Sequence, residues 1–335
     1  MISSSSAGAG GGAGGAGGGI GTGTGTGTGT GDTVLQAAYV LHYTPFRDTS
    51  FIVDFFTLEQ GRIGLVARGA RSAKSRTRAL YQPFRPVLVT WIAGKGDLHT
   101  LTGIEESGPA MDMGNSALAC GYYLNELMLR LVGKSQAMPE LFAHYALALA
   151  NLSAVSGSGV SCSGGSSSGV SSSSVSSSGV SSNGVSEDIE IILRSFELQL
   201  LSALGLLPDF TRLADGGKVD HDQSYRYYPE NALTILDVSG QTGLKSGLTT
   251  PDTHPDGVTP DKGIKVSGAT LHALALLDFS NSTTLVEAKP LMRHVMRTHL
   301  GDRPLRSREM FDSLVRPDRI DGTDGTDGTD GHFQS

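Results

Sequence analysis

The spacing of apolar residues along the chain changes its period near residue 109. Upstream of this point apolar and polar residues alternate over short runs, as is typical of half-buried β-strands. Strands are predicted at residues 38–42, 50–57, 62–68, 87–92 and 98–104. Thr44 and Pro45 predict a turn after the first strand, and Gly94-Lys95-Gly96 predicts a hairpin between the last two. Short antiparallel strands of this kind favour a small closed barrel, because closure removes exposed sheet edges.

The link between the third and fourth strands decides which barrel is expected. This link is long and polar, and it favours the five-stranded oligonucleotide-binding (OB) barrel over an SH3-like barrel.

Downstream of Pro109 the apolar residues recur at helical spacing. Helices are predicted from Asn115 or Ser116 to about Val132, from Pro139 through Leu149, and at residues 188–204, 271–279 and 284–300, with Gly301 ending the last. A short hairpin is predicted at residues 225–228 and 233–238. The fold class is therefore α+β.

Low-complexity tracts interrupt this pattern. Residues 1–32 are mostly Gly, Ser and Thr, and residues 152–186 repeat Ser, Gly and Val. Residues 240–268 are rich in Gly, Pro and Thr, and residues 319–335 contain an Asp-Gly-Thr repeat. Such tracts bury too little apolar surface to offset the entropy of ordering them. We predict disordered tails at residues 1–32 and 319–335, a barrel at 33–108, and a helical domain at 109–318 with the two internal tracts as insertions.

Targeting and metal signals are absent from the sequence. The N-terminus has no positively charged segment followed by an apolar core, so no signal peptide is predicted. No apolar run approaches the ~18 residues of a membrane span. Cys120 and Cys162 are the only cysteines, too few for a four-ligand zinc site. We expect a cytoplasmic protein without a metal or other cofactor.

Basic residues concentrate within residues 61–96, although the chain carries a formal net charge of -7. Like charges this close repel one another unless solvent or a ligand neutralises them. A basic loop between barrel strands is a common way to hold a phosphate backbone. The candidate DNA-binding residues are Arg62, Arg68, Arg71, Lys74, Arg76, Arg78, Arg85 and Lys95. The alternatives are ordinary strand charges for Arg62 and Arg85, and a solvated loop without a ligand for the whole set.

Further residues of the predicted barrel are candidates for nucleic-acid contacts. Arg47 lies in the first turn, although Asp48 beside it offers an ion-pair partner. Aromatic rings stack on bases with ~1–3 kcal/mol each. The aromatic candidates are Phe46, Tyr81, Phe84 and Trp91. Tyr81 and Phe84 lie nearest the basic loop, whereas Trp91 shares a strand face with two valines and is expected in the core.

The sequence does not match the enzyme motifs that it partly resembles. Gly133-Lys134-Ser135 resembles the end of a phosphate-binding P-loop, but Met128 occupies the position of the earlier glycine and a helix precedes it. The chain contains no His-Glu-x-x-His or Gly-x-Ser-x-Gly sequence. We therefore predict a protein that is not an enzyme.

Longer sequence blocks carry a resemblance to a known family. Two blocks fall in the predicted barrel, AYVLHYTPFRDTSFIVD at residues 38–54 and GRIGLVARGARSAKSR at residues 61–76. Two fall in predicted helices, GYYLNELMLRL at residues 121–131 and LRSFELQLLSALG at residues 193–205. RPLRSREMF follows at residues 303–311. In this order the blocks resemble the bacterial recombination mediator family RecO, across residues 35–315.

The resemblance implies a function that spacing alone does not show. RecO proteins bind single- and double-stranded DNA, anneal complementary strands and contact the C-terminal tail of the single-stranded DNA-binding protein (SSB). With RecR they help load RecA at gaps. The resemblance implies the same partners and a nucleoid-associated, cytoplasmic location. Many members carry a four-cysteine zinc module, but residues 210–222 contain no cysteine here, so no zinc is predicted.

The family's pocket for the SSB tail involves the third predicted helix. An arginine beside an apolar groove suits an acidic, apolar peptide end. The candidate pocket residues are Arg194, Arg130, Leu127 and Phe196. The alternative for Arg194 is an ion pair with Glu190 or Glu197 at helical spacing.

A second basic surface is predicted on the last long helix. Lys289, Arg293 and Arg297 recur every four residues and form one stripe. The stripe is either a DNA surface or the solvated face of an amphipathic helix. Two other functions stay open beside DNA binding: a protein-interaction module with the barrel as scaffold, and an RNA-binding OB protein, because charge alone does not distinguish the two backbones.

Overall fold

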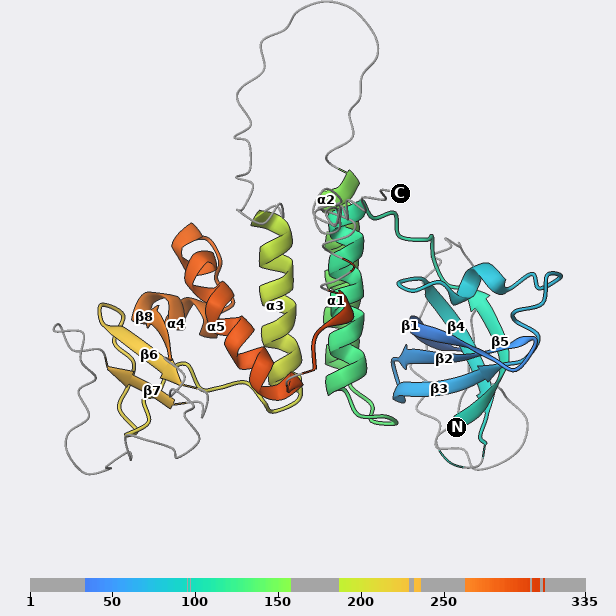
Figure 1. The fold of residues 1–335 in the computed structure, drawn as a ribbon, viewed down its shortest axis with the longest axis horizontal. Helices are drawn as coiled ribbons and strands as arrows, with labels where there is room; N and C mark the ends of the chain where they lie inside the picture. The colour runs from blue at the N-terminus through green and yellow to red at the C-terminus, as the bar shows by residue number, and fades with distance from the viewer. Residues whose placement is uncertain are drawn as a thin grey trace, which may run out of the picture. The chain divides into compact units, whose positions relative to one another are not determined.

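The N-terminal part of the chain forms a closed five-stranded barrel in the order β1-β2-β3-β5-β4 (Figure 1). The structure is a computed structural model that describes residues 34–94, 96, 98–157, 187–228, 232–235, 263–301, 303–307 and 310. The strands are β1 (Gln36–Phe46), β2 (Ser50–Thr57), β3 (Gly61–Ala67), β4 (Pro86–Ile92) and β5 (Leu98–Glu106). Neighbouring strands are antiparallel except β3 and β5, which are parallel. The predicted barrel and the α+β class are confirmed.

The end of β1 was predicted wrongly. Thr44 and Pro45 do not turn the chain; they pair with Ile52 and Phe51 of β2, and β1 continues to Phe46. Proline is tolerated there because β4 pairs with β1 only from Gln36 to Tyr39, so the outer edge of β1 carries no ladder with β4 at Pro45. The outer part of β1 therefore pairs with β2 alone, while β2 pairs with β3 on its other side.

The barrel interior is filled by alternating side chains from its strands. Its hydrophobic cluster includes Val40, Val53, Phe55, Leu65 and Val89, each of them fully buried. The opposite face of β1 and β2 belongs to a second, larger cluster that is shared with the helices and includes Tyr39, Leu41 and Phe56. The strands β1 and β2 are thus covered on both faces.

The rest of the described chain is mainly helical (Figure 1). The helices are α1 (Asn115–Leu131), α2 (Pro139–Gly157), α3 (Glu187–Ala203), α4 (Gly268–Ala275) and α5 (Ser282–Leu300). A three-stranded sheet has the order β7-β6-β8, from β6 (Ser224–Tyr228), β7 (Ala232–Ile235) and β8 (Ile264–Ser267). Gly301 follows α5 with a φ of 70°, which only glycine adopts readily.

Some predicted boundaries need correction. Helix α2 extends to Gly157, into the tract predicted to begin at residue 152, and β8 lies within the loop predicted at residues 240–268. Helix α1 begins after Gly114 without a side-chain cap, so neither Asn115 nor Ser116 has the predicted capping role. The low-complexity residues 1–33 and 158–186, and residues 236–238 of the predicted hairpin, lie outside the described residues. In the described chain no helix is both long and apolar enough to span a bilayer.

Candidate nucleic-acid interface

Five exposed cations lie on the segment that connects β3 to β4. We call this set the basic loop; its members are Arg68, Arg71, Lys74, Arg76 and Arg78. The segment turns outward at Gly69, where φ is 70°, and includes a short 3-10 helix, η1 (Arg78–Tyr81). Ala70 and Tyr81 are buried in the barrel cluster and hold the segment against the barrel. The loop is therefore anchored at both ends while its charges face solvent.

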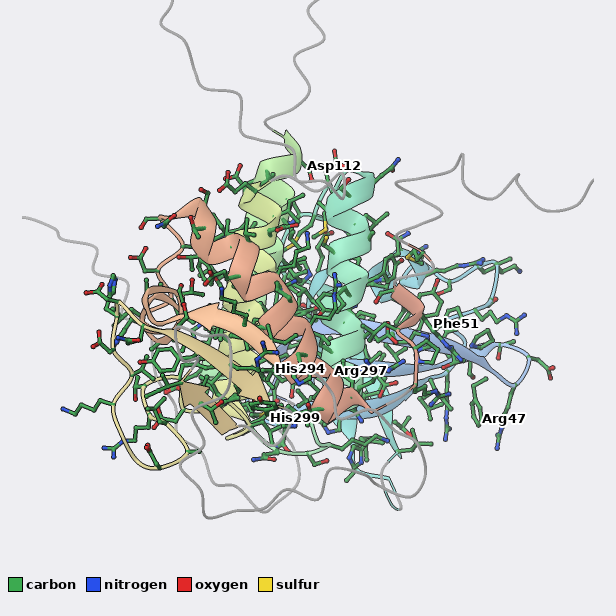
Figure 2. The ribbon with its side chains drawn as sticks, turned by 60° about the vertical axis from the view of Figure 1, so that its left-hand side comes forward. Arg47, Phe51, Asp112, His294, Arg297 and His299 are labelled. Carbon is green, nitrogen blue, oxygen red and sulfur yellow. The ribbon has the colours of Figure 1, made fainter. Side chains whose placement is uncertain are left out.

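The basic loop contacts the connection between β1 and β2. The Arg71 backbone N–H donates to the Thr49 carbonyl at 2.9 Å, and Arg71 Nη1 lies 3.5 Å from the Arg47 carbonyl. Figure 2 shows Arg47 at the end of this connection, and its guanidinium carbon lies 5.1 Å from the centre of the Phe46 ring. Arg47 has a φ of 53°, so its backbone itself makes the tight turn. The structure thus brings Arg47 beside the basic loop, as a nucleic-acid surface would require.

Arg62 has a different environment from the basic loop. Its guanidinium donates to the Leu129 carbonyl and lies 3.5 Å from the Met128 carbonyl, both in the last turn of α1. The Arg62 carbonyl in turn accepts from the Ser135 N–H at 2.8 Å. Carbonyls at a helix C-terminus lack intrahelical donors and attract cations. Arg62 therefore joins the barrel to α1, and its charge is already matched.

Arg85 is also engaged within the chain. Its guanidinium pairs with Glu106 at the end of β5, and its side chain is only 16% exposed. The alternative of an ordinary strand charge describes this environment better than a phosphate contact. Lys95 lies outside the described residues.

The predicted stacking roles of Tyr81 and Phe84 are wrong, because both rings are buried. Tyr81 is 4% exposed and packs 6.0 Å from Phe51, ring centre to ring centre. Phe84 is 5% exposed and packs edge-on against Tyr122 of α1. Nearness to the basic loop in sequence did not reveal that both rings turn inward. Trp91 is partly buried against the barrel cluster, in line with its expected core position.

The sequence analysis missed one accessible ring next to this surface, that of Tyr43. It is 38% exposed and lies on the β1 extension that the predicted turn had removed. A register shift between Val40 and His42 places Tyr43 opposite Val53, so the period-two spacing of Tyr39 and Leu41 does not predict its direction.

The residues predicted for an SSB-tail pocket do not line an open groove. Leu127 and Phe196 are buried in the large core, at 0% and 1% exposure, so their predicted role as apolar pocket lining is wrong in this structure. Arg194 Nη1 pairs with Glu197 Oε2 at 2.7 Å, as the alternative anticipated. Burial raises the pKa of Glu197, while Arg194 and the hydrogen bond from Tyr123 lower it. These side chains form a polar contact between α1 and α3.

Arg130, the other predicted pocket residue, binds the C-terminal segment of this chain. It pairs with Glu126 at 2.7 Å and donates to the carbonyls of Arg303 and Pro304 at 2.8 and 2.5 Å. Glu126 accepts from the backbone N–H groups of residues 306 and 307 at 3.0 and 2.8 Å. The pair therefore binds the carbonyls of residues 303 and 304 and the N–H groups of residues 306 and 307.

The predicted basic stripe on α5 is divided. Lys289 pairs with Glu190 of α3, whereas Arg293 and Arg297 are exposed. Figure 2 labels Arg297 on α5. Two cations of the stripe are thus available to a ligand. Among the described residues, no three His, Cys, Asp or Glu side chains are grouped to hold a metal ion.

Comparison with known proteins matches both parts of the chain to one family. Residues 32–109 match the family model described as recombination protein O N terminal, and residues 182–309 match recombination protein O C terminal. The chain is 34% identical over 288 residues to the DNA repair protein RecO of Glaesserella parasuis, covering 86% of this chain and 98% of that protein. It is 35% identical over 285 residues to the RecO protein of Nitrosococcus oceani, covering 84% and 94%.

Proposed function

Since the chain belongs to the RecO family of DNA repair proteins, we propose that it is a DNA-binding recombination mediator. It binds single- and double-stranded DNA through the basic loop and Arg47, and it anneals complementary strands. With RecR it helps RecA assemble on SSB-coated DNA. The barrel supplies the phosphate contacts, and the helical part supplies the contacts to protein partners.

The observation that carries the proposal is a difference between two groups of cations. Arg62 and Arg85 are matched by carbonyls of α1 and by Glu106. The basic-loop side chains are exposed and, within the described residues, none has an acidic partner at ion-pair distance. Repelling charges that the fold holds together without counter-charges favour binding of a polyanion.

Partner binding rests on family membership more than on geometry. The buried Leu127 and Phe196 do not offer an apolar groove, so an SSB tail must use other residues or a rearranged helix pair. Arg293 and Arg297 on α5 are exposed, and we propose them as a second surface for phosphates. The barrel surface is the stronger candidate, because it has more exposed cations than α5.

Binding of a labelled single-stranded oligonucleotide, measured by fluorescence anisotropy at several salt concentrations, tests the proposal. Removing one phosphate-binding cation should reduce the slope of log K against log salt by ~0.7 on single strands. The triple variant Arg71→Glu, Lys74→Glu and Arg76→Glu should therefore bind weakly and with a flatter salt dependence. It should also fail to anneal complementary strands.

A control variant with the same change in net charge shows whether an effect comes from the basic loop or from net charge alone. The variant Arg212→Glu, Lys218→Glu and Lys265→Glu changes three exposed cations of the helical part by the same amount. It should keep the salt slope of the unmodified protein. Equal slopes for all three proteins would exclude the basic loop as the binding surface, and stronger competition by RNA than by DNA of the same sequence would favour the RNA-binding alternative.

A further inference from the structure

Tyr43 is the most exposed aromatic residue of the β1–β2 hairpin. It is 38% exposed, whereas Phe51, its diagonal neighbour on β2, is 6% exposed. The two rings meet edge to face, with centres 5.0 Å apart. Phe51 in turn lies 6.0 Å from Tyr81, so three rings form a row from the barrel core to its surface. Tyr43 is the outer end of this row.

The position of the Tyr43 ring is fixed by the fold. Its strand pairs with β2 through Val53, and its ring rests on Phe51, which is anchored in the barrel cluster. A ring held in this way loses little conformational freedom when a flat ligand stacks on it.

Cations lie along the same hairpin. Arg47 follows Tyr43 at the end of β1, and three intervening residues of extended strand separate them by roughly 13 Å. Arg71 of the basic loop reaches the Arg47 carbonyl within 3.5 Å. A flexible polyanion that contacts Arg47 and Arg71 can therefore reach Tyr43 within the ~4–16 nucleotides that one OB barrel typically covers.

We propose that Tyr43 stacks on a base of single-stranded DNA while Arg47 and Arg71 hold the flanking phosphates. The inference rests on the proposed DNA binding and adds a contact that discriminates single strands from duplex. In a duplex the bases are stacked on one another, so the Tyr43 ring finds no free base face. A single strand exposes those faces, and stacking on them tolerates any sequence.

The test compares Tyr43→Ala and Tyr43→Phe with the unmodified protein in the anisotropy assay. Tyr43→Ala should weaken single-strand binding by at least about fivefold, the lower end of one stacked base, and leave duplex affinity unchanged. Its salt slope should equal that of the unmodified protein, because no charge is removed. Tyr43→Phe retains the ring and should bind normally.

An abasic oligonucleotide gives a second measurement that needs no variant. The unmodified protein should bind it at least about fivefold more weakly than the normal strand, since the phosphates remain and the bases are absent. Equal affinity for the two strands would overturn the stacking role even if Tyr43→Ala failed to fold.

The results of these assays distinguish a failure of the Tyr43 stacking role from a failure of the proposed DNA binding. Steep salt dependence with no effect of Tyr43→Ala or of abasic sites would overturn the stacking role and leave the basic loop intact. Equal losses of affinity for single strands and duplex would assign Tyr43 to structural support of the hairpin. No binding of single strands at low salt would overturn both proposals.

Discussion

The side-chain amide of Asn125 in α1 donates a hydrogen bond of 2.7 Å to the backbone carbonyl of Leu41 in β1. The Asn125 carbonyl oxygen accepts from the Tyr145 hydroxyl of α2. Asn125 and Tyr145 are almost fully buried, at 2% and 0% exposure. The Asn125 amide thus bonds both to a barrel strand and to a second helix at a buried site, and it links the barrel to the helical part.

Replacing Asn125 with alanine should destabilise the protein by about 1–3 kcal/mol, because a buried carbonyl and a buried hydroxyl lose their partner. Urea denaturation followed by circular dichroism measures the change. Asn151→Ala on the exposed face of α2 is the matched control and should shift stability by at most about 0.5 kcal/mol. Equal stability of the two variants would show that the Asn125 hydrogen bonds carry no net stabilisation.

Arg62 should contribute to stability, whereas we propose that the basic loop contributes to DNA binding. Arg62→Met keeps much of the side-chain volume but removes the donor that Arg62 supplies to the Leu129 carbonyl at the C-terminus of α1. Loss of a charged hydrogen bond predicts a destabilisation of about 1–3 kcal/mol. The salt slope of single-strand binding should stay within error of the unmodified protein. A reduced slope in folded Arg62→Met would instead return Arg62 to the phosphate-binding set.

The strand at residues 50–57 and the contact of Arg62 show what could and what could not be predicted from the sequence. Residues 50–57 were predicted as a strand with its observed bounds, because period-two spacing is a local signal. The partner of Arg62 lies 67 residues away, so no local pattern reveals it. The location of the basic loop was likewise evident from charge. The inward direction of Tyr81 depends on packing in the closed barrel, and that of Phe84 depends on packing against α1.

Cys120 should be inert in the folded protein. It is 3% exposed, and burial raises the pKa of its thiol to about 12. The thiolate is the reactive form, so at neutral pH both access and ionisation oppose modification. In a Cys162→Ser background Cys120 is the sole thiol. It should react with a thiol reagent only after denaturant is added, and rapid labelling of the native protein would contradict the buried position.

The contact between Glu126 and the C-terminal segment should make stability depend on pH. Partial burial acts to raise the pKa of Glu126, but hydrogen bonds from Ser307 and Arg306 and the charge of Arg130 outweigh it. The pKa therefore lies below its ordinary value of 4.5. Because the folded state favours the ionised form, this stabilisation is present above the unfolded pKa and is lost as pH falls through the folded pKa.

Glu126→Gln should consequently destabilise the protein by about 1–3 kcal/mol at pH 7, and the difference from the unmodified protein should shrink as the pH falls below 4.5. Urea denaturation at pH 7 and at acidic pH measures both values. Glu140→Gln on the exposed start of α2 removes the same charge without these hydrogen bonds and serves as control. A difference for Glu126→Gln that stays constant over this range would mean that side-chain shape, and not the ionised carboxylate, holds residues 303–307 against α1.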